Sequence, residues 1–187
     1  MTTATTTLTA PDGSPRMTTA TATTLTTPDG PFSLVADDGA VLASGWTDDV
    51  AALVALVHPG LRPVSVRTEA SPSGDGTGQA ADAVAAYYDG DTRAPARVAV
   101  RQRSGPYREH AWALLRAVEP GESVTYTELA ARSGRPAAVR AAAGACAMNA
   151  AALFVPCHRV LRSDGSLGGF RYGLPVKESL LARERRA

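Results

Sequence analysis

The chain has 187 residues, of which 44% are hydrophobic and 20% are charged, and its formal net charge at pH 7 is +1. This length suits one domain or two small lobes with an ordinary hydrophobic core. The longest apolar runs, such as residues 51–57, are far shorter than the roughly 20 residues that cross a bilayer. No basic segment leads into an apolar one, as it does in a secretory signal. We therefore expect a cytoplasmic protein rather than a membrane-spanning one.

The two cysteines, Cys146 and Cys157, are too few for a disulfide framework. The sequence has no CxxC pair and no paired Cys/His spacing of the kind that holds structural zinc. We expect two free thiols and no metal. A reducing compartment suits free thiols because it keeps the sulfur unoxidised.

Charge is distributed unevenly along the chain. Residues 1–96 hold 4 Arg/Lys and 11 Asp/Glu, whereas residues 97–187 hold 15 and 7. The basic C-terminal half is typical of a surface that meets a polyanion such as DNA. The alternative is that these basic residues form only a solvated face.

Residues 1–31 are expected to be a disordered tail rich in Thr and Ala. Stretches 1–13 and 17–30 form an imperfect duplication of Thr, Ala, Pro, Asp and Gly, a composition that cannot bury a core. The second copy begins at Met17, so translation could start there.

Residues 32–96 are expected to form an N-terminal α/β domain. The segments 32–36 and 40–46 flank an Asp-Asp-Gly turn and predict a β-hairpin. The other elements are predicted in this order: a helix over 48–60 capped by Asp48, a strand over 62–68, a flexible loop over 69–79 and a helix over 80–91.

Residues 97–187 are expected to form a mainly helical C-terminal domain. Segment 96–105 predicts a strand or an extended linker, and residues 106–121 predict a helix from their apolar spacing. Residues 126–149 read as helix, Gly/Pro turn and helix, which is the outline of a helix-turn-helix. A last helix is predicted over 175–186.

The second helix of this pair consists mostly of alanine and glycine. A helix that reads bases in the major groove usually carries several polar side chains, and this one offers chiefly Arg140. Small side chains instead permit close approach to a narrow groove or to another backbone. Two tightly packed core helices remain the alternative.

The motif Val-Pro-Cys-His-Arg-Val at 155–160 places a thiol, an imidazole and a guanidinium side by side. Free cysteine is among the most buried residue types, so Cys157 could simply fill the core. The motif alone favours that interpretation over the alternative of a nucleophile, although a thiolate beside a base is reactive.

Three segments, 125–130, 135–149 and 154–184, together resemble the O6-alkylguanine-DNA alkyltransferase family. The resemblance is carried by Pro-Cys-His-Arg-Val, the Gly-rich loop after it, the Arg and Asn before it and a terminal Leu-Leu-x-x-Glu helix. It implies an α/β fold with a small ribonuclease-H-like N-terminal lobe and a helical domain with a helix-turn-helix. It also implies a monomer without cofactor that moves an alkyl group irreversibly from O6-alkylguanine, and from O4-alkylthymine, in double-stranded DNA to its own cysteine.

The resemblance assigns catalytic roles to five residues. Cys157 is the nucleophile, His158 acts on it through a bridging water and Glu184 orients the imidazole. Asn149 fixes the turn around the cysteine. Tyr126 hydrogen-bonds guanine N3 and can donate a proton to it.

Further residues are assigned to the substrate and the DNA. The carbonyls of Cys157 and Val160 accept from the exocyclic amine of the base, and the N–H of Arg171 donates to O6. Phe170 and Tyr172 are the aromatic residues of the loop, and Lys177 matches the lysine of the closing helix. Arg140 is assigned to enter the base stack in place of the flipped nucleotide, and Ala138 and Ala141 permit approach to the minor groove. Three arginines contact phosphates or form structural ion pairs: Arg132, Arg135 and Arg159. Cys146 lines the base pocket.

The chain departs from some relatives that hold zinc in the N-terminal lobe, because its only His or Cys there is His58. Two other functional classes stay open. One is a non-catalytic protein that binds alkylated DNA, and the other is a DNA-binding regulator that senses alkylation.

Overall fold

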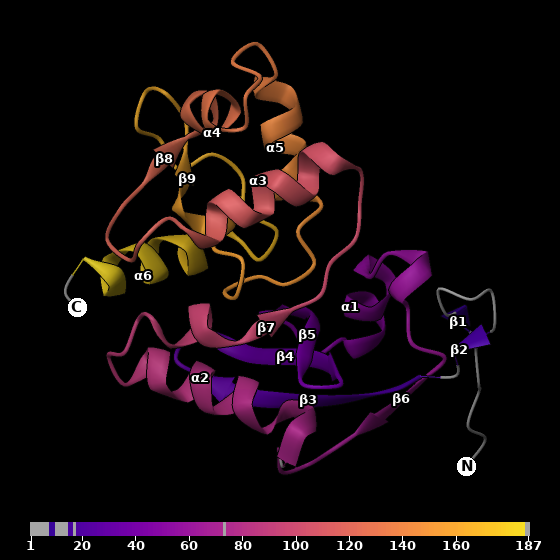
Figure 1. The fold of residues 1–187 in the computed structure, drawn as a ribbon. Helices are drawn as coiled ribbons and strands as arrows, with labels where there is room; N and C mark the ends of the chain where they lie inside the picture. The colour runs from indigo at the N-terminus through magenta and orange to yellow at the C-terminus, as the bar shows by residue number, and fades with distance from the viewer. Residues whose placement is uncertain (1–7, 10–14, 17, 73, 186–187) are drawn as a thin grey trace.

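The computed structural model describes residues 8–9, 15–16, 18–72 and 74–185. A five-stranded mixed sheet lies beside a cluster of helices built from the C-terminal half of the chain (Figure 1). The α/β fold that the sequence predicts is confirmed, while its likeness to ribonuclease H and the helix-turn-helix assignment stay predictions. No helix in the described part of the chain is long and apolar enough to span a membrane.

The sheet has the strand order β6-β3-β4-β5-β7. Its strands are β3 (Thr19–Thr27), β4 (Gly30–Asp37), β5 (Ala40–Gly45), β6 (Ser65–Thr68) and β7 (Ala99–Val100). The three central strands are antiparallel, and each edge strand runs parallel to its neighbour. The predicted hairpin is confirmed, and Asp38 and Gly39 take the positive φ angles, 50° and 69°, that a tight hairpin turn requires.

Strand β3 corrects the prediction of a disordered tail over 1–31. Residues 1–7, 10–14 and 17 lie outside the described residues, and β1 (Leu8–Thr9) pairs with β2 (Pro15–Arg16). Residues 19–27, however, form an inner strand bonded to a neighbour on each side. Threonine is β-branched and favours the pleated sheet, and the small side chains of Ala20 and Ala22 are fully buried. Composition alone therefore misjudged this segment.

Two helices cover opposite faces of the sheet, α1 (Val50–Leu56) and α2 (Gln79–Tyr88). Successive side chains of β4 point to opposite faces, so Phe32 and Leu34 pack with α2 and Val35 packs with α1. Asp49, not the predicted Asp48, caps α1 by accepting from the N–H of Ala52 at 2.9 Å. Short turns of helix complete this half: η1 (Pro59–Leu61), η2 (Gly74–Gly78) within the predicted loop, and η3 (Ala94–Arg97).

The C-terminal half contributes four helices, α3 (Pro106–Arg116), α4 (Tyr126–Arg132), α5 (Val139–Ala147) and α6 (Leu174–Glu184). The short strands β8 (Val124–Thr125) and β9 (Val160–Leu161) pair in parallel, and η4 (Cys157–Arg159) carries the thiol. Thr125 and Glu128 form a capping box at the start of α4. Gly134, with a φ of 74°, lies in the turn that follows the end of α4. The second helix of the pair starts at Val139, later than predicted, because residues 136–137 form a turn.

The two halves meet along strand β5. The N–H of Ser44 donates to Ala150 O at 2.8 Å, and its hydroxyl donates to Ala152 O at 2.7 Å. Strand β7 pairs with β5, so the sheet extends past the boundary predicted at residue 96. The division of the chain into two domains at that boundary stays a prediction. These contacts place strand β5 against the segment that leads to Cys157.

Candidate active site

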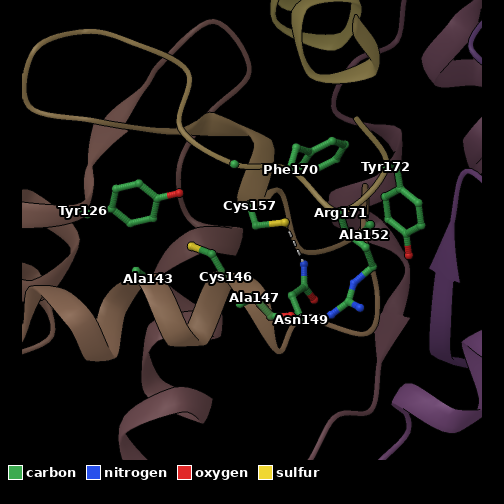
Figure 2. A pocket seen from close by; sticks show the side chains of 11 residues that line it. Tyr126, Ala143, Cys146, Ala147, Asn149, Ala152, Cys157, Phe170, Arg171 and Tyr172 are labelled. Atoms are coloured by element: carbon green, nitrogen blue, oxygen red, sulfur yellow. Dashed lines mark hydrogen bonds between the residues drawn. The ribbon is translucent and has the colours of Figure 1, made fainter. Parts of the chain in front are cut away.

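A cavity of about 390 Å³ opens beside Cys157, between α5, η4 and the loop before α6 (Figure 2). Small and aromatic side chains form most of its wall. The lining residues are Tyr126, Ala143, Cys146, Ala147, Asn149, Ala152, Cys157, Gly169, Phe170, Arg171 and Tyr172. The structure therefore gathers seven of the residues that the resemblance names around one cavity large enough for a small organic ligand.

Asn149 holds the thiol and the turn before it. Its amide nitrogen donates to Cys157 Sγ at 3.2 Å and to Val155 O at 2.8 Å. Its amide oxygen accepts from the side chain of Gln102 at 3.0 Å and from the N–H of Ala151 at 3.1 Å. These two donors set the orientation of the amide, so the NH₂ group points at the sulfur.

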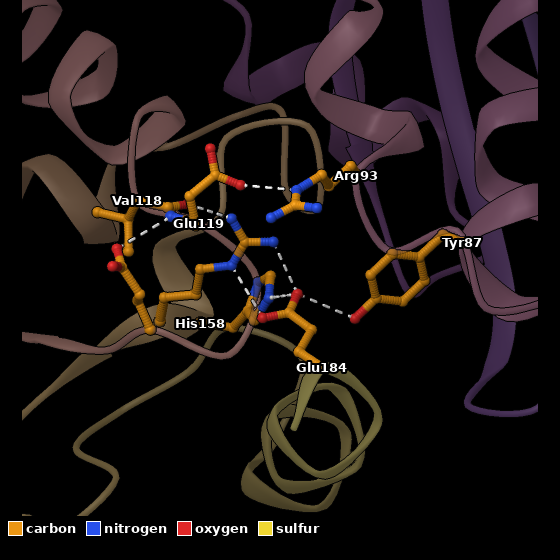
Figure 3. Close-up of polar contacts among 8 residues, drawn as sticks. Tyr87, Arg93, Val118, Glu119, His158 and Glu184 are labelled. Atoms are coloured by element: carbon orange, nitrogen blue, oxygen red, sulfur yellow. Dashed lines mark hydrogen bonds and ion pairs between the residues drawn. The ribbon is translucent and has the colours of Figure 1, made fainter. Parts of the chain in front are cut away.

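Behind the thiol, Glu184 lies at the centre of a buried polar network (Figure 3). Its carboxylate pairs with His158 Nε2 at 2.8 Å and accepts from Arg159 at 2.8 and 2.9 Å. The hydroxyl of Tyr87, from α2, donates to the same carboxylate at 3.2 Å. Arg159 also donates to Val118 O and is buried, so of its two predicted roles the structural ion pair is the one that the structure contains.

The network sets the protonation of Glu184 and His158. Burial alone would raise the pKa of Glu184, but the hydrogen bonds and charges of His158 and Arg159 lower it to about 2. The carboxylate is thus ionised and can only accept, which assigns the imidazole proton to Nε2. Nδ1 is then an available lone pair. It is buried and has no hydrogen-bond partner in the part of the chain that the structure describes.

Burial also controls the thiol–imidazole pair. It raises the pKa of Cys157, while the hydrogen bond from Asn149 and the charge of Lys177 oppose this more weakly. Burial lowers the pKa of His158, although Glu184 opposes the shift. At neutral pH the cysteine is therefore a thiol and the histidine a neutral imidazole, whose Nδ1 is able to accept a proton.

Lys177 ties α6 to the loop. Its ammonium is fully buried and donates to Val160 O at 2.6 Å and to Leu167 O. Val160 is absent from the cavity wall, and its carbonyl already accepts one hydrogen bond from this lysine. The predicted contact between that carbonyl and a base stays a prediction.

The loop before α6 covers one side of the cavity and rests on the N-terminal sheet. The rings of Phe170 and Tyr172 lie 5.9 and 5.7 Å from Trp46, and the Tyr172 hydroxyl donates to Ser44 O at 3.2 Å. The guanidinium of Arg171 donates to Ala147 O at the end of α5. The loop is therefore held from both halves of the molecule.

Gly168 gives a first testable prediction about this loop. Its φ is +67°, and an added Cβ would lie 3.2 Å from the hydroxyl of Tyr126. We expect Gly168→Ala to lower the free energy of unfolding by about 1 to 2 kcal/mol from the backbone conformation alone, with a further loss from the displaced Tyr126. Gly165→Ala is the matched control, because its φ is +81° and nothing lies within 4 Å of its added Cβ. Urea unfolding measures the free energy of unfolding of both variants. Equal losses in the two variants would show that the contact with Tyr126 does not contribute to the effect of Gly168→Ala.

The residues predicted to contact DNA lie on another side of α5. Arg135, Arg140 and Ala141 line a separate groove together with Tyr107, and Ala138 is the residue that precedes α5. Arg135 stacks over the Tyr107 ring at 5.8 Å. Helix α5 thus separates the thiol cavity from an exposed, basic groove.

Cys146 lines the cavity as predicted, but burial raises its pKa well above the ordinary value. It stands as an inert thiol at neutral pH. The pKa of Tyr126 is also raised by burial, so its hydroxyl stays protonated and can donate. Among the described residues, no group of three or more His, Cys, Asp or Glu side chains is placed to hold a metal ion.

Sequence reasoning missed Tyr87 and Gln102, which both reach the site from outside the motif.

A second prediction concerns Tyr87, whose hydroxyl shares a Glu184 oxygen with His158. We expect Tyr87→Phe to lower the free energy of unfolding by about 1.5 kcal/mol, because the bond is to a charged group. The carboxylate then interacts more strongly with the imidazole, so the pKa of His158 rises, which NMR titration measures. Tyr88→Phe is the control, because the hydroxyl of Tyr88 is hydrogen-bonded to Asp29 and Trp46 instead. If the pKa of His158 is unchanged in Tyr87→Phe, then Tyr87 contributes only packing.

The fold consists of a mixed-sheet half and a helical half. The helical half holds a hydrogen-bonded thiol on a cavity, with a buried network of His158, Arg159 and Glu184 behind it. These features define a candidate site built around one cysteine. Residues 106–186 match the family described as 6-O-methylguanine DNA methyltransferase, DNA binding domain. This match covers less than half of the chain, and it confirms the resemblance seen in the sequence.

Individual proteins agree with this assignment. The chain is 48% identical over 82 residues to the bifunctional transcriptional activator/DNA repair enzyme Ada of Escherichia coli, which covers 44% of this chain and 23% of that protein. It is 36% identical over 99 residues to the methylated-DNA--protein-cysteine methyltransferase of Haemophilus influenzae, covering 53% and 55%. The chain thus spans only part of the length of the curated relatives it matches. The fold is similar to the crystal structure of Mycobacterium tuberculosis OGT in complex with DNA, with a TM-score of 0.71 at 24% identity, covering 89% and 93%.

Proposed function

We propose that this protein removes an alkyl group from O6 of guanine in double-stranded DNA and keeps it on Cys157. The observation that carries the proposal is the placement of Cys157 Sγ, held by Asn149, in a cavity that the Tyr126 hydroxyl also faces (Figure 2). A nucleophile and a hydrogen-bond donor on one cavity suit attack on an alkyl carbon and departure of an anionic base.

The reaction begins with loss of the thiol proton. His158 Nδ1 accepts it through the bridging water that the sequence resemblance implies, and the ionised Glu184 stabilises the imidazolium that forms. The charge of Lys177 and the Asn149 amide favour the thiolate. The resting thiol is therefore neutral, and it becomes nucleophilic only as its proton moves.

The sulfur then attacks the saturated carbon attached to O6. A carbon–sulfur bond forms, the carbon–oxygen bond breaks, and its electron pair stays on guanine, which leaves as an anion and takes up a proton. Tyr126 stabilises that charge by donating at N3, since its hydroxyl is protonated. The product is a thioether, which no group in the site reverses, so each molecule acts once and needs no cofactor.

The target base is unreachable inside a duplex and must be rotated into the cavity. Helix α5 is suited to this role because Ala138 and Ala141 are small and Arg140 is exposed. Arg140 fills the place of the rotated nucleotide, and Arg135 contacts a phosphate. The relative from Mycobacterium tuberculosis, crystallised in complex with DNA, supports the choice of partner.

O4-alkylthymine is included in the proposed substrate range. We also propose that the protein acts as a monomer in the cytoplasm, where free thiols stay reduced. A non-catalytic binder would not require the thiol network described above and is not favoured. An alkylation-sensing regulator would use the same thiol, and no observation favours that further role.

The test is intact-mass spectrometry after incubation with a duplex that contains O6-methylguanine. The expected result is a mass gain of one methylene unit, saturating at one per molecule, with the modification on the peptide that contains Cys157. A protein whose mass stays unchanged while it binds the duplex would support the non-catalytic alternative instead.

A further inference from the structure

We propose that a second groove, at the seam between the two halves, binds the phosphate backbone of the DNA that flanks the damaged base. This arginine groove is defined by Arg62, Arg101, Arg103 and Arg108, and its cavity measures about 180 Å³. It lies between the end of α1 with η1 and the segment that leads from β7 into α3 (Figure 1). The inference rests on the proposed function, because it assumes that α5 faces DNA.

Charge is the first observation. Four arginines and one histidine, His58, line the groove, and none of its lining residues is an Asp or a Glu. Arg101 is partly neutralised by Asp37 at 3.1 Å and Asp38 at 3.8 Å. The other three arginines make no ion pair with any described residue. Unneutralised guanidinium groups that converge on one groove are suited to phosphate oxygens.

The arginines are held in place by different means. The Nη2 of Arg62 donates to Ala55 O at 3.0 Å and to Val57 O at 3.1 Å, and its Nε is buried without a hydrogen-bond partner in the described part of the chain. Arg108 donates to the Ser104 hydroxyl at 3.3 Å. Arg103 is exposed, and its Nη1 lies 3.1 Å from the position that a Cβ at Gly60 would take. Arg103 is therefore the residue free to reach a phosphate.

Position along α5 is the second observation. The neighbouring groove that contains Arg135 and Arg140 shares Ser104 and Arg108 with the arginine groove, so the two are continuous. Together they follow α5 from Arg140 to Met148, whose side chain is 52% exposed.

The thiol cavity borders the same helix on another side, through Ala143, Cys146 and Ala147. A duplex whose flipped base enters that cavity at α5 thus has an arginine-lined path for one of its strands beside the same helix. Besides Asp37 and Asp38, which pair with Arg101, the carboxylate of Glu109 lies near this path. It accepts from the backbone N–H of Ser104 at 2.7 Å, which partly offsets its charge.

This arrangement assigns a part in DNA binding to the N-terminal half through Arg62 and to the segment between β7 and α3 through Arg103, without any contact to a base. Phosphate contacts position a protein but carry no sequence information, so their contribution must be equal for damaged and undamaged DNA. Each phosphate contact releases counterions, and its loss is therefore visible in the salt dependence of binding.

The experiment compares wild type, Arg103→Gln and the double variant Arg62→Gln/Arg103→Gln on an undamaged duplex and on one that contains O6-methylguanine. Plots of log Kd against log salt concentration are expected to lose a slope of about 1 per arginine removed, equally on both duplexes. Arg97→Gln is the charge-matched control, because Arg97 is exposed, pairs with Asp91 and lies outside the groove.

Reaction with free O6-benzylguanine separates this inference from the proposed function. That small substrate needs no DNA, so its rate is expected to equal that of wild type in every variant that folds. Salt slopes that match those of wild type in Arg103→Gln, the exposed single change, would overturn the inference. Failure of wild type to gain mass from the O6-methylguanine duplex would overturn the proposed function instead, and the salt slopes would still decide whether the groove binds DNA.

Discussion

Replacement of Cys157 by alanine is expected to abolish alkyl transfer completely and to leave DNA binding intact. The sulfur is the only nucleophile that Asn149 holds in the cavity, and the network behind it serves to accept its proton. The Cys157 side chain is small and partly exposed to the cavity, so its loss changes little of the DNA-facing side of α5. Labelling with O6-benzylguanine measures transfer, and a titration with an O6-methylguanine duplex measures binding.

Cys146→Ala is the matched control for this experiment, because both thiols line the same cavity. The raised pKa of Cys146 keeps it protonated, so its loss is expected to leave the stoichiometry of labelling unchanged. Residual labelling of Cys157→Ala that disappears in the double variant would instead make Cys146 a second acceptor and contradict our assignment of a single reactive thiol.

The role of Cys157 was not predictable from its own motif. Cys157, His158 and Arg159 are adjacent in the sequence, but these three residues left open whether the cysteine fills the core or reacts, and the family resemblance of segments elsewhere in the chain favoured the reactive role. The structure places Glu184 against His158 at 2.8 Å, the geometry that the family resemblance implies. The roles themselves stay predictions until they are measured.

Tyr87 shows where sequence reasoning ends. It precedes Glu184 by 97 residues and lies on a helix whose own pattern indicates only an apolar face. Its contact with Glu184 exists because the N-terminal sheet docks against the segment at Ala150 and Ala152, through Ser44. Docking of one half against another depends on packing over many residues, and no local pattern encodes it.

Strand β3 shows the opposite error. Its Thr-rich sequence has the composition of a solvated tail, yet β4 and β6 bond to it on both sides. A strand with partners on both sides is stabilised by its neighbours as much as by its own side chains. Composition is therefore a poor guide for small β-branched residues that pair with a hydrophobic hairpin.

These contacts give the N-terminal half a physical role in the site. From that half, Trp46 packs against the loop aromatics and Tyr87 reaches Glu184. Gln102, which follows strand β7 of the same sheet, accepts from the N–H of Ala150 and donates to Asn149. Each of them braces a residue that touches the thiol or its base. The sheet therefore stabilises the site geometry although it supplies none of the reacting atoms.

The second large effect is expected at Glu184, where Glu184→Gln removes the charge and keeps the shape. The fully buried carboxylate balances Arg159, whose side chain is only 6% exposed, so its neutralisation leaves a buried guanidinium without a counter-charge. Loss of one partner of a buried pair costs about 3 to 5 kcal/mol. We expect the free energy of unfolding in urea to fall by that amount at neutral pH. Glu178→Gln, at an exposed position of the same helix, is the control and is expected to change it little.

The pH dependence separates this charge effect from a loss of packing. The pKa of Glu184 is lowered from 4.5 to about 2 on folding, so the unfolded chain binds the proton first and the stabilisation is present above about pH 4.5. This stabilisation is lost as the pH falls from about 4.5 to about 2. Glu184→Gln has no carboxyl group at this position, so its free energy of unfolding does not fall for this reason. The difference in stability between wild type and Glu184→Gln is thus expected to shrink as the solution is acidified. A difference that stays constant over this range would mean that shape, rather than charge, is what Glu184 contributes to the fold.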